Sequence, residues 1–153
     1  MSTVADPVPA AIHRGDDELP WVSVGDGVEL KVLMVRDDLW VIRNRFAPGV
    51  VVPTHRHTGA VYAHTLAGSW KYAEYPEVNR AGSFLYEPPG SVHTLTVPAD
   101  NDGPTDVIFQ IHGANLNLDA DGRVESVTDG PGVLAAYLAV CEAAGLPRPP
   151  VIT

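Results

Sequence analysis

Short apolar runs separated by turn-forming pairs constrain this chain more than any other feature of its sequence. Segments rich in β-branched and aromatic residues are expected to be strands: Val28–Val35, Leu39–Phe46, Val61–Leu66, Ser69–Tyr75, Ser83–Tyr86, Thr94–Val97, Asp106–His112 and Arg123–Val127. Pairs such as Pro48-Gly49 and Asp121-Gly122 punctuate them, and 14 Gly with 14 Pro are too many for a helix bundle. Many short strands with frequent turns predict an all-β sandwich or barrel.

One helix is expected near the C-terminus, at residues 131–145. Asp129 can cap its first turn, and Gly145 followed by Pro147 is a typical end. Leu134, Tyr137, Leu138 and Cys141 give the helix an apolar stripe that we expect to pack on the outside of the barrel. Cys141 is the only cysteine, so it has no internal disulfide partner, and we interpret it as a small core residue.

Length and charge narrow the classes of protein. A chain of 153 residues is long enough for one domain with its own core, which we place at residues 21–153 after a tail or covering arm at 1–20. A formal charge of −9 argues against nucleic acid and anionic membrane surfaces as partners. No apolar run is long enough to span a membrane, and the first residues lack a signal-peptide pattern, so a cytoplasmic location is expected.

The residues that suggest chemistry are histidines at two places. His55 and His57 are one residue apart, so on a strand both rings project from the same face and can chelate one ion. The segment Gly82–His93 carries a third, His93, behind a turn made rigid by Pro88 and Gly90. Three neutral imidazoles suit Fe(II), Zn(II), Mn(II), Ni(II) or Cu(II), and the sequence does not choose among these metals.

This joint pattern resembles the two-part signature of the cupin superfamily. The first motif opens with G-x5-H-x-H, matched by Gly49, His55 and His57, and the second is G-x5-P-x-G-x2-H, matched from Gly82 to His93 without a gap. The resemblance implies a cupin β-barrel, a jelly-roll-like double-stranded β-helix, with the three histidines as metal ligands. Cupins commonly pair, so a homo-oligomer, most simply a homodimer, is expected.

The chain departs from the first motif at its acidic residue. The family usually has Glu five residues after the second His, but that position is Tyr62, while the following Gly68 is present. On strand Ser69–Tyr75, alternation places Glu74 on the same face as Trp70 and Tyr72, so Glu74 is the expected substitute ligand. The alternative is that Glu74 lies at the strand end in solvent, and Glu87, next to Pro88, is a weaker candidate because it is expected on a turn.

Other polar and aromatic residues are candidates for the pocket around the metal. Those considered for a catalytic or substrate-contacting role are Tyr62, His64, Gln110 and His112. Those expected to form its walls are Trp70, Tyr72 and Phe109, which suit an aromatic substrate. His13 belongs to the tail and is expected to be solvated.

A finer resemblance is to small single-domain cupins of the 2,4'-dihydroxyacetophenone dioxygenase type. The segments that carry it are His55–Val61, Thr65–Tyr72 and Tyr86–Leu95, together with the C-terminal helix. The resemblance implies non-haem Fe(II) and cleavage by O2 of the C–C bond in an aromatic α-hydroxyketone. Two alternatives stay open on the same fold: a zinc-binding sensor of the anti-sigma type, and a metal-dependent isomerase or lyase that needs no O2.

Overall fold

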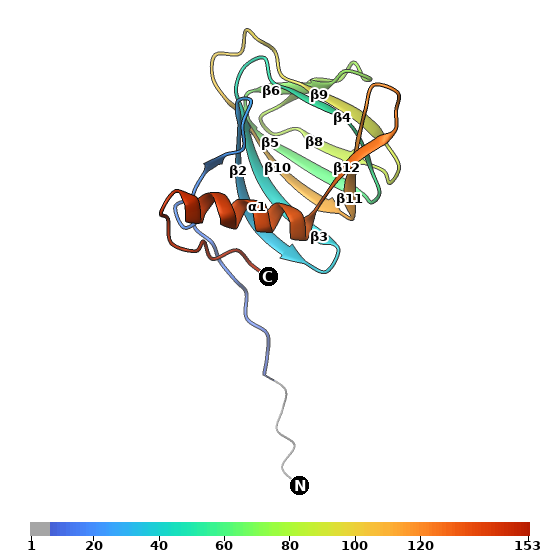
Figure 1. Cartoon of the computed structure of the whole chain (residues 1–153). Coiled ribbons are helices and arrows are strands. Elements are labelled where there is room, and N and C mark those ends of the chain that lie inside the picture. The colour runs from blue at the N-terminus through green and yellow to red at the C-terminus, as the bar shows by residue number, and fades with distance from the viewer. Residues whose placement is uncertain (1–6) are drawn as a thin grey trace.

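The computed structural model describes residues 7–153, so the first six residues of the predicted tail lie outside it. Two six-stranded antiparallel sheets curve around a shared interior, and one helix lies next to β2 and β12 (Figure 1). This architecture confirms the predicted all-β barrel with a single C-terminal helix.

The first sheet holds the strands that carry most of the apolar core. Its strand order is β1-β2-β3-β10-β5-β8. The bounds, in that order, are Val22–Ser23, Val28–Arg36, Leu39–Phe46, Thr105–His112, Val61–Ala67 and Phe84–Glu87. Because β8 is the last strand, it pairs only with β5 within this sheet.

The second sheet holds the histidine motifs. Its strand order is β12-β11-β4-β9-β6-β7. The bounds, in that order, are Val124–Asp129, Ala114–Leu118, Val51–His57, Val92–Thr96, Ser69–Tyr72 and Asn79–Arg80. The structure adds four strands to the segments predicted as strands: β1, β4, β7 and β11. β1 and β7 are only two residues long, and β4 and β11 are rich in polar residues, so a search for apolar runs does not indicate them.

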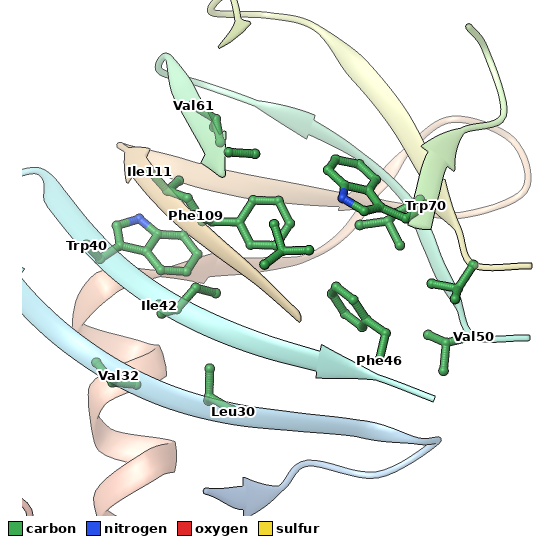
Figure 2. Packing of buried hydrophobic residues seen from close by; sticks show 14 of the residues in the cluster. Leu30, Val32, Trp40, Ile42, Phe46, Val50, Val61, Trp70, Phe109 and Ile111 are labelled. Carbon is green, nitrogen blue, oxygen red and sulfur yellow. The ribbon is translucent and has the colours of Figure 1, made fainter. Parts of the chain in front are cut away.

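Alternating inward residues of both sheets fill the barrel. Figure 2 shows Trp40, Phe46, Trp70 and Phe109 packed between the strands, together with smaller aliphatic side chains. Trp70 is fully buried, and its indole N–H donates a hydrogen bond of 2.9 Å to the Thr65 hydroxyl. This hydrogen bond gives a partner to the indole N–H, which is the only polar group of the Trp70 side chain.

Helix α1 (Gly130–Ala143) packs against β2 of the first sheet and also contacts β12 of the second, and its residues Val133 and Ala136 face the barrel interior (Figure 1). The Asp129 carboxylate accepts from Gly132 N–H and caps the first turn, as predicted. Tyr137 and Cys141 are the deepest side chains of the apolar stripe, and burial raises the pKa of the Cys141 thiol, which keeps it protonated. Within residues 7–153, no helix is long and apolar enough to cross a membrane.

Residues 14–21 cover part of the first sheet's outer face. Asp16 accepts from Arg43 at 2.7 Å and from the buried Lys31 at 3.1 Å. Trp21 lies under the Arg45 guanidinium, whose carbon is 4.1 Å from the ring centroid. The arm is thus fastened to the barrel by ion pairs and cation–π contacts.

Candidate metal centre

Three histidines from two neighbouring strands lie inside the barrel, and donor atoms of two of them, His57 and His93, approach within 4.8 Å of each other, whereas His55 lies outside this close set. His55 and His57 lie on β4 and His93 on β9, and all three are buried while Arg56 between the first pair is exposed. His55 stands directly opposite His93 in the antiparallel register. A bulge between Val52 and His55 sets this register, because Pro53 has no N–H to donate to the ladder.

A buried carboxylate completes the group. Glu87, the last residue of β8, is 1% exposed, and its Oε2 lies 3.1 Å from Nε2 of His57. Its other oxygen accepts a hydrogen bond from the Tyr72 hydroxyl. Donor atoms of His57, Glu87 and His93 all lie within 4.8 Å of one another, so these three residues form a compact set of possible ligands.

Hydrogen bonds fix which ring nitrogens of the β4 histidines are free. Nδ1 of His55 lies 2.9 Å from the carbonyl of Pro53, which only accepts, so Nδ1 carries the proton. Nδ1 of His57 lies 2.8 Å from Oδ1 of Asn115 and donates to it in the same way. When either ring is neutral, its free lone pair is then on Nε2, the nitrogen that can bind a metal.

Burial favours the neutral form of the His55 and His93 rings. Burial lowers the pKa of His55, an effect opposed by its hydrogen bond to Pro53. Burial also lowers the pKa of His93, an effect opposed by the negative charge of Glu87. Because a metal displaces protons from its ligands, histidines that are already neutral bind it without the cost of deprotonation.

The residues present fit a divalent metal. Four buried polar atoms at this site have no hydrogen-bond partner: Nε2 of His57, Oε2 of Glu87, and Nδ1 and Nε2 of His93. Buried polar groups are rarely left unpaired, because desolvation without a partner costs about 1–3 kcal/mol each. A cation coordinated by imidazole and carboxylate would satisfy the atoms that the protein itself leaves without partners.

A cavity of about 420 Å³ opens beside the histidines. Polar groups at its wall include His55, His57, Tyr72, Asn115 and Asn117. Most other lining residues are apolar, and include Trp40, Ile42, Phe46, Leu95, Phe109 and Ile111. The cavity therefore suits a small, largely apolar molecule with its polar end at the histidines.

The structure corrects the expected position of Glu74. Strand β6 ends at Tyr72, so Glu74 lies in the following turn, where its side chain is exposed. Its carboxylate accepts from the backbone N–H of Thr94 at 3.0 Å. Burial acts to raise the pKa of Glu74, but hydrogen bonds to Thr94 and to its own backbone, together with the nearby His93, outweigh burial and hold the pKa below its ordinary value. The buried acid beside the histidines is instead Glu87.

The other predicted pocket residues divide between the cavity and the rest of the barrel. Tyr72 and Phe109 line the cavity as expected, but Trp70 does not, because its ring is buried in the core. The four residues considered for catalysis do not line the cavity either: Tyr62, His64, Gln110 and His112. They alternate with buried neighbours on β5 and β10 and therefore face outward.

The sequence prediction gave Glu87 only as a weaker candidate and did not include Asn115. Glu87 was expected on a turn, yet alternation from Leu85 along β8 already indicates that both share the inner face. Asn115 belongs to β11, where Asn115 and Asn117 alternate with Leu116 and Leu118. That period-two pattern is the signal that identifies the strand and the face on which Asn115 lies.

The substitution Glu87→Gln is expected to weaken metal binding by roughly 10- to 100-fold, since a neutral amide replaces the anion beside the ligands. Glu125→Gln makes the same chemical change at an exposed position on β12 and is the matched control, expected to leave affinity unchanged. Competition titration with a metal-binding dye would measure both. Equal affinities for the two variants would show that Glu87 has no role at the metal.

A double-sheet barrel with buried histidines and a carboxylate defines the chain as a cupin. Residues 10–114, more than half of the chain, match the model of the ChrR cupin-like domain. The chain therefore belongs to the ChrR cupin-like family.

Three known proteins illustrate the likeness. A cupin-like protein of unknown function from Ralstonia eutropha JMP134 is 32% identical, with a TM-score of 0.80 over 88% of this chain and 91% of that one. Acetylacetone dioxygenase from Acinetobacter johnsonii shares the fold at 15% identity, with a TM-score of 0.73 over 88% and 94% of the two chains. The pectin degradation protein KdgF of Dickeya dadantii is 37% identical over 57 residues, which span 37% of this chain and only 52% of that protein.

Proposed function

We propose that this protein is a non-haem iron dioxygenase that cleaves a C–C bond of a small aromatic α-hydroxyketone, such as 2,4'-dihydroxyacetophenone, with O2. His55, His57 and His93 would hold the iron, and Glu87 lies beside them in place of the predicted Glu74. When bound, Fe(II) supplies the redox change that reaction with O2 requires and that Zn(II), with its filled d shell, does not supply. The fold shared with acetylacetone dioxygenase supports this reaction class.

The cavity lining is the observation that carries the proposal. No Lys or Arg is among the described residues that line it, and its single acidic residue is Asp26. A sugar acid or a phosphorylated substrate would have to leave its anionic group without a cationic partner there, which costs free energy. A neutral aromatic ketone meets Phe46, Phe109 and their apolar neighbours without that cost.

The charge of the ligand set favours a substrate that binds as an anion. Three neutral imidazoles leave the +2 charge of the ion to be balanced by Glu87 at first and, once Glu87 has taken up the substrate's proton, by the substrate anion. An α-hydroxyketone can supply that charge by losing a proton. The histidines thus select for a group that becomes anionic only at the metal end of an otherwise apolar cavity.

Tyr72 and Glu87 offer a route for the proton that the substrate loses. Tyr72 lines the cavity, and its hydroxyl donates to Oε1 of the buried Glu87. A proton from the substrate could pass to the Tyr72 oxygen while the Tyr72 proton moves to Glu87. This contact keeps the acceptor within reach of the cavity but shielded from water.

The proposed reaction balances with O2 as its only co-reactant. The bond between the carbonyl carbon and the hydroxylated carbon breaks, and each carbon gains one oxygen atom from O2. The products are an aromatic carboxylic acid and, for a terminal hydroxymethyl group, formic acid. Both carbons are oxidised and O2 is the group that is reduced.

A second candidate is a zinc-binding sensor of the anti-sigma type, which the match to the ChrR cupin-like domain favours. The cavity distinguishes the two hypotheses, because a sensor that only holds zinc has no need of an apolar space of this size beside its ligands. An isomerase or lyase would use the same cavity without consuming O2.

Anaerobic reconstitution with Fe(II) or Zn(II) would test the proposal. The iron protein is expected to consume one O2 per molecule of 2,4'-dihydroxyacetophenone and to release two acids, while the zinc protein stays inactive. An oxygen electrode and chromatography of the products would measure both quantities. Conversion by the zinc protein without O2 would instead identify an isomerase or lyase, and tight zinc binding with no turnover of any hydroxyketone or diketone would favour the sensor.

A further inference from the structure

Strand β11 places two asparagines in the wall of the cavity, one strand away from the β4 histidines. Asn115 stands opposite His57, and Asn117 stands opposite His55, in the antiparallel register. Both asparagines line the cavity, whereas Leu116 between them does not. We call Asn115 and Asn117 the amide pair. Because neighbouring strands lie about 4.8 Å apart, a molecule that reaches the histidines also passes the amide pair.

Each amide has one end bound by the protein and the other end free. Oδ1 of Asn115 accepts from Nδ1 of His57 at 2.8 Å. Nδ2 of Asn117 donates to the hydroxyls of Ser126 and Thr128 at 3.0 and 2.9 Å. Within residues 7–153, no side chain or carbonyl accepts from Nδ2 of Asn115, and no group donates to Oδ1 of Asn117. The amide pair therefore offers one donor and one acceptor to the contents of the cavity.

The spacing of the amide pair suits one small polar group between its members. Residues two apart on a strand share a face, with Cα atoms about 6.7 Å apart. An oxygen that hydrogen-bonds to both amides, at about 2.9 Å from each, fits within this spacing. Only a group that both donates and accepts satisfies both free ends. A neutral hydroxyl does so, whereas a carboxylate or phosphate only accepts and a methyl group does neither.

The wall that faces the amide pair is apolar. Ile42, Phe46 and Phe109 of the first sheet line the cavity there and belong to the core cluster. The cavity thus combines apolar surface for the faces of a flat ring with two polar groups for its rim. A ring that carries a hydroxyl matches both walls.

We propose that the amide pair binds a neutral hydroxyl group on the aromatic ring of the substrate, away from the ketone. The hydroxyl donates to Oδ1 of Asn117 and accepts from Nδ2 of Asn115. This inference deepens the proposed function and rests on it for the choice of an aromatic ketone. It assigns hydroxyaryl ketones as the preferred class over those with a bare ring or an anionic ring substituent, which leave a partly buried amide unpaired.

Calorimetric titration of the full chain with acetophenones, without added iron, tests the assignment. The ligands lack the side-chain hydroxyl of an α-hydroxyketone, so the proposed cleavage does not occur during the measurement. We expect para-hydroxyacetophenone to bind about 10- to 100-fold more tightly than para-methylacetophenone, which has the same shape but no hydroxyl. Para-methoxyacetophenone accepts but cannot donate, so its affinity should lie near that of the methyl ligand.

Asn117→Leu removes the acceptor while keeping a side chain of similar size. The ratio of the two dissociation constants should fall to about one, and the methyl ligand should bind at least as tightly as it binds to the wild type. A barrel that was merely disturbed would bind both ligands less well. Leu116→Val changes the neighbouring side chain on the other face of β11 and is the matched control, expected to keep the wild-type ratio. Circular dichroism would show that both variants are folded.

Three results would overturn the amide-pair assignment: equal affinities of the wild type for the hydroxyl and methyl ligands, a wild-type ratio in Asn117→Leu, or an equal loss of both affinities in that variant. The outcome is separate from that of the dioxygenase proposal. A wild type that shows the expected ratio but consumes no O2 when loaded with iron would retain the amide pair and reject the dioxygenase. O2 consumption with equal affinities would do the reverse.

Discussion

Replacing His57 with alanine is expected to lower metal affinity by more than about 100-fold, beyond the 10- to 100-fold typical of losing an outer partner. The reason is that Nε2 of His57 lies at the centre of the group, within 3.1 Å of Glu87, and its ring is locked by Asn115. His93→Ala should have an effect of the same size. Metal analysis of protein purified without oxygen, together with competition titration, measures the loss.

His64→Ala is the control for these two variants. His64 is a histidine of the same barrel, but it faces outward on β5 and does not line the cavity. Metal content should therefore stay at the wild-type level in His64→Ala. Full occupancy in either His57→Ala or His93→Ala would show that the buried histidines are structural and that the metal binds elsewhere.

Trp70→Ala is expected to lower the free energy of unfolding by about 3–5 kcal/mol, the usual cost of truncating a buried tryptophan. The substitution leaves a cavity next to Phe109, whose ring centroid lies 5.9 Å from that of Trp70. It also removes the indole N–H that donates a hydrogen bond to the Thr65 hydroxyl. Urea unfolding of metal-free protein would measure the change. Metal-free protein is used so that loss of packing is not confused with loss of metal.

Tyr75→Ala removes an aromatic ring that is 45% exposed and should cost far less stability than Trp70→Ala. Trp70→Phe should fall between the two, because it keeps most of the packing and loses the hydrogen bond. A Trp70→Ala protein as stable as Tyr75→Ala would mean that the core around Trp70 relaxes to fill the space.

Patterns that are local in sequence predicted the fold and part of the site. The run Leu39–Phe46 is a strand over those residues, as its richness in β-branched and aromatic side chains predicts. The pairing of His55 with His57 needed only the alternation of a single strand. Metal coordination by these histidines and His93 remains a prediction, although the structure brings them to the same interior.

Features set by contacts between distant strands could not be predicted in this way. The point at which β6 ends decides that Glu74 is exposed, and that point depends on the Tyr75 N–H bonding back to Tyr72 in a turn. The depth of Trp70 depends on Phe109, which is far away in sequence. Glu87 is brought to His57 only because the two sheets close into a barrel.

The candidate metal centre joins the two sheets to each other. Glu87 comes from β8 of the first sheet, whereas His57 and His93 come from β4 and β9 of the second. An ion held by all three would act as a cross-link between the halves of the barrel, and its binding free energy would add to the stability of the folded chain. Opening of the barrel would then require release of the ion, so the lifetime of this protein against cellular proteases would follow the supply of metal.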